Sequence, residues 1–210
     1  MLYLYIVRHG ETVWNAAERI QGRLDSRLTE KGRNYARLLG EKLQDTDFTR
    51  IISSPSQRTM ETAQLLKAKR NIPVCKDERI MEMAMGPWQG MTKAEIQLQY
   101  PIEYEWFMTR PERYQNAGAE TFFDMENRAR DFLSELQNGT LHGNILVVTH
   151  GLLIKTLFAI FKGIEIKDIW REQTVAGTSL SIVKMDREGL EILLESDMSH
   201  VPEEKVANRS

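Results

Sequence analysis

The sequence predicts an α/β domain with three layers, in which helices cover both faces of a mostly parallel sheet. Short apolar runs alternate with amphipathic stretches along the 210 residues, and this alternation is typical of parallel strands joined by helices. Two runs near the C-terminal end flank a turn, which predicts an antiparallel edge. No repeat or Gly-rich linker divides the chain. We therefore expect one domain over residues 1–202 and a polar tail over residues 203–210.

The first half of the chain supplies three expected strands and two expected helices. The strands are predicted at the β-prone runs 2–7, 50–53 and 72–75. Thr29 has the side chain to cap the first helix, whose apolar residues recur at helical spacing through Leu43. Ser54 and Pro55 are expected as the N-cap and the first residue of the second helix.

The second half adds an insertion, two helices, a strand and a hairpin. Residues 86–118 are too long for an ordinary connection, so we expect a lid over a site. A helix follows, with one apolar face running from Phe122 to Leu136. Residues 145–149 form a buried strand, and the run 152–161 after it is apolar almost all round, which predicts a buried helix. The expected hairpin pairs residues 178–185 with 190–195, around a turn at residues 186–189.

Composition excludes disordered, collagen-like and disulfide-scaffold proteins. Hydrophobic residues make up 41% and charged residues 28%, which is ordinary for a globular domain. A net charge of −2 speaks against general nucleic-acid binding. Cys75 is the single cysteine, which fits a reducing compartment. The apolar runs are too short for a signal peptide or a membrane span, so we expect a cytoplasmic protein without a membrane partner. The oligomeric state is left open between a monomer and a homodimer.

Two of the four histidines follow buried strands in the same way. His9 and His150 each precede a glycine, and each is separated by a single residue from a run of aliphatic residues. Because ligands bind outside the carboxyl ends of parallel strands, we expect both rings at one site. Arg8 adjoins His9, and Arg58 lies in the first turn of a helix that follows a strand. Two guanidinium groups, two imidazoles and a helix N-terminus predict a pocket for a compact, multiply charged anion, and phosphate fits best.

A histidine beside a phosphate has a covalent route to hydrolysis. Neutral imidazole can attack phosphorus, displace an alcohol and hold the phosphoryl group, and a pKa of about 6.5 leaves a neutral fraction near pH 7. One carboxyl group can protonate the leaving alkoxide and later deprotonate water. Glu82 is the best-placed candidate, and Glu11 is an alternative from spacing alone. No spacing suggests a metal site or a nucleotide-binding loop, so we expect neither a metal nor a cofactor.

These residues lie in segments that resemble the motifs of the histidine phosphatase superfamily, in the branch that contains the cofactor-dependent phosphoglycerate mutases. The matching residues, in chain order, are Arg8 to Thr12 with Trp14 and Asn15, Gln21 with Gly22, Leu28 to Gly32, Ser53 to Pro55 with Arg58, Thr62 and Ala63, Glu82 with Gly86, Trp88 and Gly90, Glu120, Arg128, Thr149 to Gly151, and Gly177 to Ser179. The resemblance covers nearly the whole chain, and motifs that follow one another in this order at family-like spacing are a specific signal.

The resemblance implies a phosphoglycerate mutase-like fold and a metal-free mechanism. It implies that His9 is the phosphorylated nucleophile and that Glu82 is the proton donor and acceptor. It implies that Arg8, Arg58 and His150 clamp the transferring phosphoryl group. The residues that it places at the phosphate site are Arg8, Thr12, Asn15, Gln21, Gly22, Arg58 and the backbone of Gly151.

Within the family, the pattern Gly-x-Trp-x-Gly after Glu82 and the short chain are most similar to the PhoE-type broad-specificity phosphatases. Basic residues in the expected lid are few, namely Lys93, Arg110 and Arg113. We therefore expect a phosphatase that accepts aryl or alkyl monophosphates as small-molecule substrates. A cofactor-dependent phosphoglycerate mutase and a catalytically silent module that binds a phosphorylated ligand are the alternatives.

Overall fold

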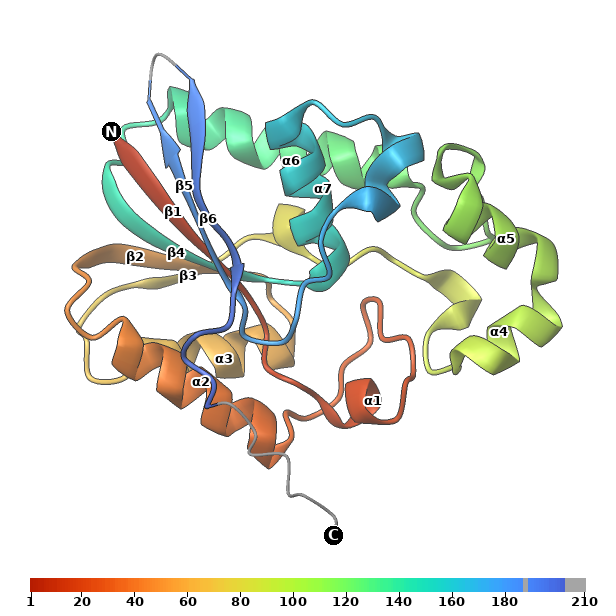
Figure 1. Cartoon of the computed structure of the whole chain (residues 1–210), viewed down its shortest axis with the longest axis horizontal. Helices are drawn as coiled ribbons and strands as arrows, with labels where there is room; N and C mark the ends of the chain where they lie inside the picture. The colour runs from red at the N-terminus through yellow and green to blue at the C-terminus, as the bar shows by residue number, and fades with distance from the viewer. Residues whose placement is uncertain (187–188, 203–210) are drawn as a thin grey trace, which may run out of the picture.

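A six-stranded sheet forms the centre of the molecule in the computed structural model, which describes residues 1–186 and 189–202 (Figure 1). The strands are β1 (Leu2–Arg8), β2 (Phe48–Ser53), β3 (Val74–Lys76), β4 (Gly143–Thr149), β5 (Leu180–Met185) and β6 (Leu190–Asp197). Their order is β3-β2-β4-β1-β5-β6. The first four are parallel, β5 runs antiparallel to β1, and β6 runs antiparallel to β5. The predicted sheet with an antiparallel edge is confirmed. The expected tail at 203–210 and the centre of the hairpin turn lie outside the described residues.

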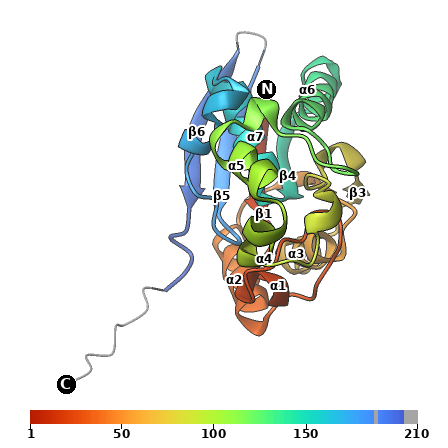
Figure 2. The ribbon, with the colours of Figure 1, turned by 90° about the vertical axis from the view of Figure 1, so that its right-hand side faces the viewer.

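Helices cover both faces of this sheet (Figures 1 and 2). One face carries α2 (Glu30–Lys42) and α3 (Gln57–Lys67), and the other carries α6 (Phe122–Asn138) and α7 (Gly151–Lys162). Side chains alternate along the strands, so Val7 and Val148 join the core under α2 and α3. Ile6 and Val147 join the core under α6 and α7. The three-layer α/β/α arrangement follows from this division.

The N-terminal caps explain where the helices begin. The hydroxyl of Thr29 accepts the N–H of Gly32 and caps α2, as predicted. The prediction for α3 was wrong by two residues, because Ser56 is its N-cap and Pro55 lies outside the helix. Ser54 still belongs to the sheet edge, since its N–H donates to the carbonyl of Val148 at 3.0 Å. The pattern of a serine before a proline did not distinguish a serine that caps the helix from one that is bonded to the sheet edge.

Residues 86–118 form a separate layer beyond the end of the sheet (Figure 1). They contain the 3-10 turns η2 (Gly86–Trp88) and η3 (Pro111–Arg113) and the helices α4 (Lys93–Gln99) and α5 (Pro101–Thr109). Trp88 is buried at the centre of this layer, with the rings of Phe107 and Tyr114 at 5.4 and 5.3 Å. The indole of Trp170, in η4 (Ile166–Arg171), donates to the carbonyl of Phe107 at 2.6 Å. This bond ties the layer to the rest of the domain.

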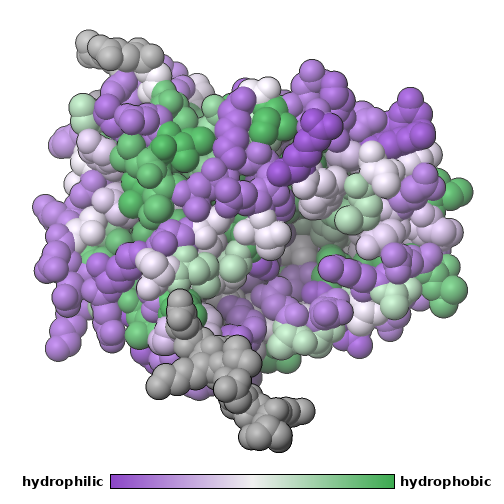
Figure 3. Space-filling model, in the orientation of Figure 1, coloured by the Kyte–Doolittle hydropathy of each residue, from purple (hydrophilic) through white to green (hydrophobic). Residues whose placement is uncertain are grey.

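The described surface has a few large apolar side chains. Leu193 on β6, Leu98 on α4 and Ile102 on α5 are exposed. Figure 3 shows hydrophobic residues over β5 and β6 and at the outer edge beyond α4 and α5. Within the described part of the chain, no helix combines the length and the apolar character that crossing a bilayer requires. None of these three residues borders the edge of the sheet where the two histidines lie.

Candidate active site

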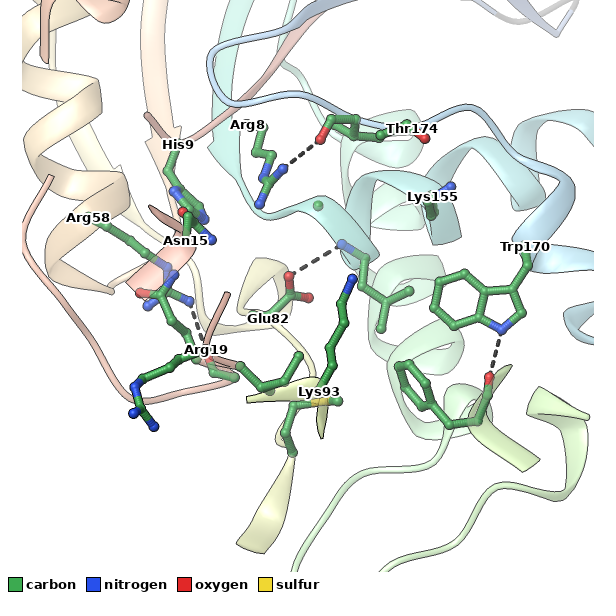
Figure 4. A pocket seen from close by; sticks show the side chains of 18 of the residues that line it. Arg8, His9, Asn15, Arg19, Arg58, Glu82, Lys93, Lys155, Trp170 and Thr174 are labelled. Carbon is green, nitrogen blue, oxygen red and sulfur yellow. Dashed lines mark hydrogen bonds between the residues drawn. The ribbon is translucent and has the colours of Figure 1, made fainter. Parts of the chain in front are cut away.

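A cavity of about 360 Å³ opens where β1 and β4 end. In Figure 4, Arg8 and His9 from the sheet edge and Arg58 from α3 lie around the same space as Glu82. Eight of the residues expected at the site line it, namely Arg8, His9, Asn15, Gln21, Gly22, Arg58, Glu82 and Gly151. The structure therefore brings together groups that are up to 143 positions apart, from Arg8 to Gly151.

His9 is placed by the turn that follows β1, and its ring is buried. Its Nδ1 lies 2.8 Å from the carbonyl oxygen of Gly10. Because a carbonyl only accepts, this hydrogen bond assigns the ring proton to Nδ1 and leaves Nε2 unprotonated in the neutral ring. Gly10 is required there, since a Cβ would come within 2.7 Å of the carbonyl of Gly32 in α2. The close approach of α2 thus shapes the turn that presents the nucleophilic nitrogen.

Both imidazoles are held neutral by their surroundings. Burial, and then the positive charges of Arg8 and Arg58, keep the pKa of His9 well below its usual value. Burial, and then the charge of Arg58, do the same to the pKa of His150. The folded chain therefore binds fewer protons than the unfolded chain just below about pH 6.5, so acidification through this range lowers the stability of the fold.

We expect neither ring to titrate at its usual pH. In an NMR titration of the C–H resonances, the signals of His9 and His150 should keep their neutral positions as the pH falls through about 6.5, because burial and the adjacent guanidinium groups oppose protonation. His9→Asn and His150→Asn variants assign the two signals. A midpoint at or above about 6.5 for His9 in the free protein would contradict the expected neutral nucleophile.

Arg58 is fully buried at the start of α3 and is held by a loop more than thirty residues upstream. Its Nη1 donates to the carbonyl of Leu24 and to the carboxylate of Asp25, both at 2.7 Å. Its Nη2 donates to the carbonyl of Gly22 at 2.7 Å and to Nδ1 of His150 at 3.1 Å. Asp25 also accepts the backbone N–H of Gln57, the first residue of α3. The guanidinium group is therefore fixed in position before any ligand arrives.

His150 lies next to Arg58, outside the lining of the cavity. Its ring is buried, and its centroid is 5.3 Å from that of His9. Since Arg58 donates to Nδ1, the proton of the neutral ring is on Nε2, which lies 2.8 Å from the hydroxyl of Ser54. In this arrangement His150 does not line the cavity and instead contacts Arg58, which does.

Thr12 does not line the cavity but holds residues that do. It is fully buried, caps the short helix α1 (Val13–Ala16), and its hydroxyl accepts the amide N–H of Gln21 at 2.8 Å. Its backbone N–H and hydroxyl both donate to Oδ1 of Asn15, at 3.1 and 3.0 Å. The amide oxygen of Asn15 is thus occupied, which turns its NH₂ group toward other acceptors. Thr12 orients two lining amides.

The structure separates the two candidate acids. Glu82 follows η1 (Glu78–Ile80) and points into the cavity (Figure 4), where it accepts the N–H groups of Met83 at 3.0 Å and Leu152 at 3.3 Å. Glu11 lies between β1 and α1, and its carboxylate accepts the hydroxyl of Thr29, the N-cap of α2, at 2.8 Å. Glu11 does not line the cavity. The geometry favours Glu82 for proton transfer.

The outer wall of the cavity was not predicted as a set. It is mainly apolar, with basic side chains at its margin. Its residues are Arg19, Ile20, Met85, Lys93, Phe107, Met108, Leu152, Lys155, Trp170, Thr174 and Val175. They come from four separate segments, and no local pattern marks them. Among residues 1–186 and 189–202, no group of three or more His, Cys, Asp and Glu side chains is arranged to hold a metal ion.

Comparison with known proteins places this site in context. A family model described as the histidine phosphatase superfamily (branch 1) matches residues 4–197. "Phosphoserine phosphatase 1" of Hydrogenobacter thermophilus is 32% identical over 170 residues, which cover 81% of each chain. "Probable phosphoglycerate mutase GpmB" of Erwinia tasmaniensis is 32% identical over 78% of this chain and 76% of its own. The structure of Bacillus stearothermophilus YhfR matches with a TM-score of 0.92 and 38% identity, over 95% of this chain and 99% of that one.

Proposed function

The chain belongs to the histidine phosphatase superfamily (branch 1) and is a phosphatase of that family, and on this premise we propose that it hydrolyses phosphate monoesters through a phosphohistidine on His9. One observation carries the proposal. The unprotonated Nε2 of a neutral His9 shares a cavity with Arg8, Arg58 and the carboxyl group of Glu82. A nucleophile, an anion clamp and a proton donor are the parts that this reaction requires.

The reaction proceeds in two balanced steps. Nε2 of His9 attacks phosphorus, the bond from phosphorus to the ester oxygen breaks, and protonated Glu82 gives its proton to the departing alcohol. Water then attacks the phosphoryl group while the Glu82 carboxylate takes the proton of that water. The bond from nitrogen to phosphorus breaks, which releases inorganic phosphate and restores neutral His9 and protonated Glu82.

The positive charge in the cavity supports a reaction without a metal ion. Arg58 is fully buried and rigidly held, and Arg8 is fixed by a hydrogen bond of 2.6 Å from Nη1 to the carbonyl of Val175. Nε of Arg8 and Nε of Arg58 are buried and have no hydrogen-bond partner among the described residues, so each guanidinium group keeps a donor for a phosphoryl oxygen. Groups already in place cost no reorganisation when charge develops in the transition state. The two arginines thus supply the charge stabilisation that a metal ion supplies in other phosphatases.

The outer wall supports a broad range of substrates. Phe107, Met108 and Trp170 offer apolar surface to the leaving group, and the basic side chains of the outer wall lie at its margin. An aryl or alkyl group fits such a wall without specific hydrogen bonds. Lys93 at the margin is the observation that favours the second candidate, a phosphoglycerate mutase, because an amino group suits an acidic substrate.

We expect the purified protein to hydrolyse nitrophenyl phosphate in the presence of a metal chelator. Glu82→Gln should lower kcat by about 10²- to 10⁴-fold, because general acid–base catalysis contributes that much. Glu11→Gln is the matched control and should retain turnover within about threefold, since Glu11 lies outside the cavity. Initial rates of phosphate release are measured for the unchanged protein and for both variants.

Two outcomes would overturn the proposal in different directions. A coupled mutase assay, primed with bisphosphoglycerate, whose turnover exceeds phosphate release would make the protein a mutase. Failure both to trap acid-labile phosphate on the protein and to release phosphate, with several aryl and alkyl phosphates, would make it a binding module.

A further inference from the structure

Glu82 sits in a segment without regular structure, and its backbone is held from outside by Arg128. This arginine belongs to α6. Its Nη1 donates to the carbonyl of Arg79 at 2.7 Å and to the carbonyl of Met81 at 2.6 Å. Met81 directly precedes Glu82, so one guanidinium group anchors the chain on the N-terminal side of the acid.

Glu120 anchors the other side of the same segment. Its Oε2 accepts the N–H of Ala84 at 2.8 Å, and its own N–H donates to the carbonyl of Ala84 at 2.9 Å. Its carboxylate also receives Nε and Nη2 of Arg128, at 3.0 and 3.1 Å. Only two residues, Glu82 and Met83, lie between the two anchored positions.

The environment makes this ion pair a rigid support. The side chain of Arg128 is 14% exposed and that of Glu120 is 17% exposed. Paired, charge-assisted hydrogen bonds away from water are stronger and less screened than surface pairs. Glu120 also accepts a hydrogen bond from Nη2 of Arg23 at 2.9 Å. Arg23 directly follows Gly22, whose carbonyl accepts Nη2 of Arg58. Neither Arg128 nor Glu120 lines the cavity.

We propose that Arg128 and Glu120 are positioning residues for proton transfer, because their paired hydrogen bonds hold the backbone on both sides of Glu82 and so aim its carboxyl group at the ester oxygen. The proposal rests on the function proposed above. A shift of the acid by about an ångström is enough to reduce proton transfer, whereas the nucleophile and the anion clamp have supports of their own. Loss of Arg128 should therefore impair the protonation of the leaving group more than the attack by His9.

Dependence on the leaving group distinguishes this role from general damage to the fold. Phenyl phosphate needs a proton on its poor leaving group, whereas dinitrophenyl phosphate does not. Arg128→Gln should lower kcat/KM for phenyl phosphate by about 30-fold and for dinitrophenyl phosphate by less than about threefold. We use kcat/KM because it reports the steps up to formation of the phosphoenzyme and excludes its later hydrolysis.

Arg130→Gln is the matched control. Arg130 lies two positions after Arg128 on α6, is exposed and pairs with Glu126 on the same helix. This variant should change kcat/KM for both substrates by less than about twofold. Glu120→Gln is the second test, because it keeps the size of the side chain and weakens the pair. It should show the same selectivity as Arg128→Gln, and it carries the test if Arg128→Gln does not fold.

The reference variant Glu82→Gln separates the two possible failures. It should show the strongest dependence on the leaving group. If Glu82→Gln affects both substrates equally, the proposed role of Glu82 is wrong. If Glu82→Gln is selective while folded Arg128→Gln and Glu120→Gln affect both substrates equally or neither, the positioning role is overturned and the proposed function stands.

Discussion

Replacement of His9 by alanine should abolish turnover while leaving the fold intact. The imidazole supplies the nucleophile itself, so we expect kcat for nitrophenyl phosphate to fall by a factor on the order of 10⁴ or more, with no acid-labile phosphate on the protein. The ring lies at the end of β1, and its hydrogen bond goes to the carbonyl of the next residue, Gly10. Thermal unfolding should therefore shift by only a few degrees.

His142→Ala is the control for this variant. His142 is exposed and precedes β4 at the opposite end of the sheet. Its replacement should leave turnover unchanged. Equal rates for the wild type and for folded His9→Ala would refute the assignment of the nucleophile.

Replacement of Arg58 by alanine should remove one of the positively charged groups that stabilise the transition state. We expect kcat/KM to fall by about 10²- to 10³-fold, or about 3–4 kcal/mol, which is typical when a preorganised donor to the developing charge is removed. Arg58 also satisfies two carbonyl groups and the carboxylate of Asp25. Stability should therefore fall as well, because these buried acceptors lose their donor.

Measurements on folded protein separate the two effects of Arg58→Ala. Circular dichroism defines a temperature at which the variant is fully folded, and kcat/KM is compared there. Arg58→Lys keeps the charge but cannot reproduce the forked donor geometry, so its loss should be intermediate. A loss of less than about tenfold for Arg58→Ala, or about 1.4 kcal/mol, would count against the clamp.

The convergence of the two histidines could be predicted because each follows a buried strand. Parallel strands place their carboxyl ends at one edge, and His9 and His150 both follow such ends. The same reasoning located Arg58 near the start of a helix after a strand. Hydrophobic periodicity was sufficient to predict the strands, the main helices and the hairpin, since these patterns are local.

Contacts between distant segments could not be predicted in this way. Asp25 fixes Arg58 from 33 positions away and also accepts the N–H of Gln57 at the start of α3, and no pattern around Asp25 indicates either role. Ser54 reads as a helix cap, yet its hydroxyl is bonded to His150, 96 positions away. The apolar outer wall depends on how residues 86–118 and 166–175 fold over the sheet. These features follow from tertiary packing, which local sequence patterns do not encode.

The hydrogen bond between Nδ1 of His9 and the carbonyl of Gly10 has a further consequence for the covalent intermediate. Imidazole has two ring nitrogens, and either can carry phosphorus in a free peptide. Here one of them is committed to the backbone, so phosphorus can add to the other alone. The intermediate would be a single positional isomer, the tele form, and the backbone of one turn would set the regiochemistry of the enzyme.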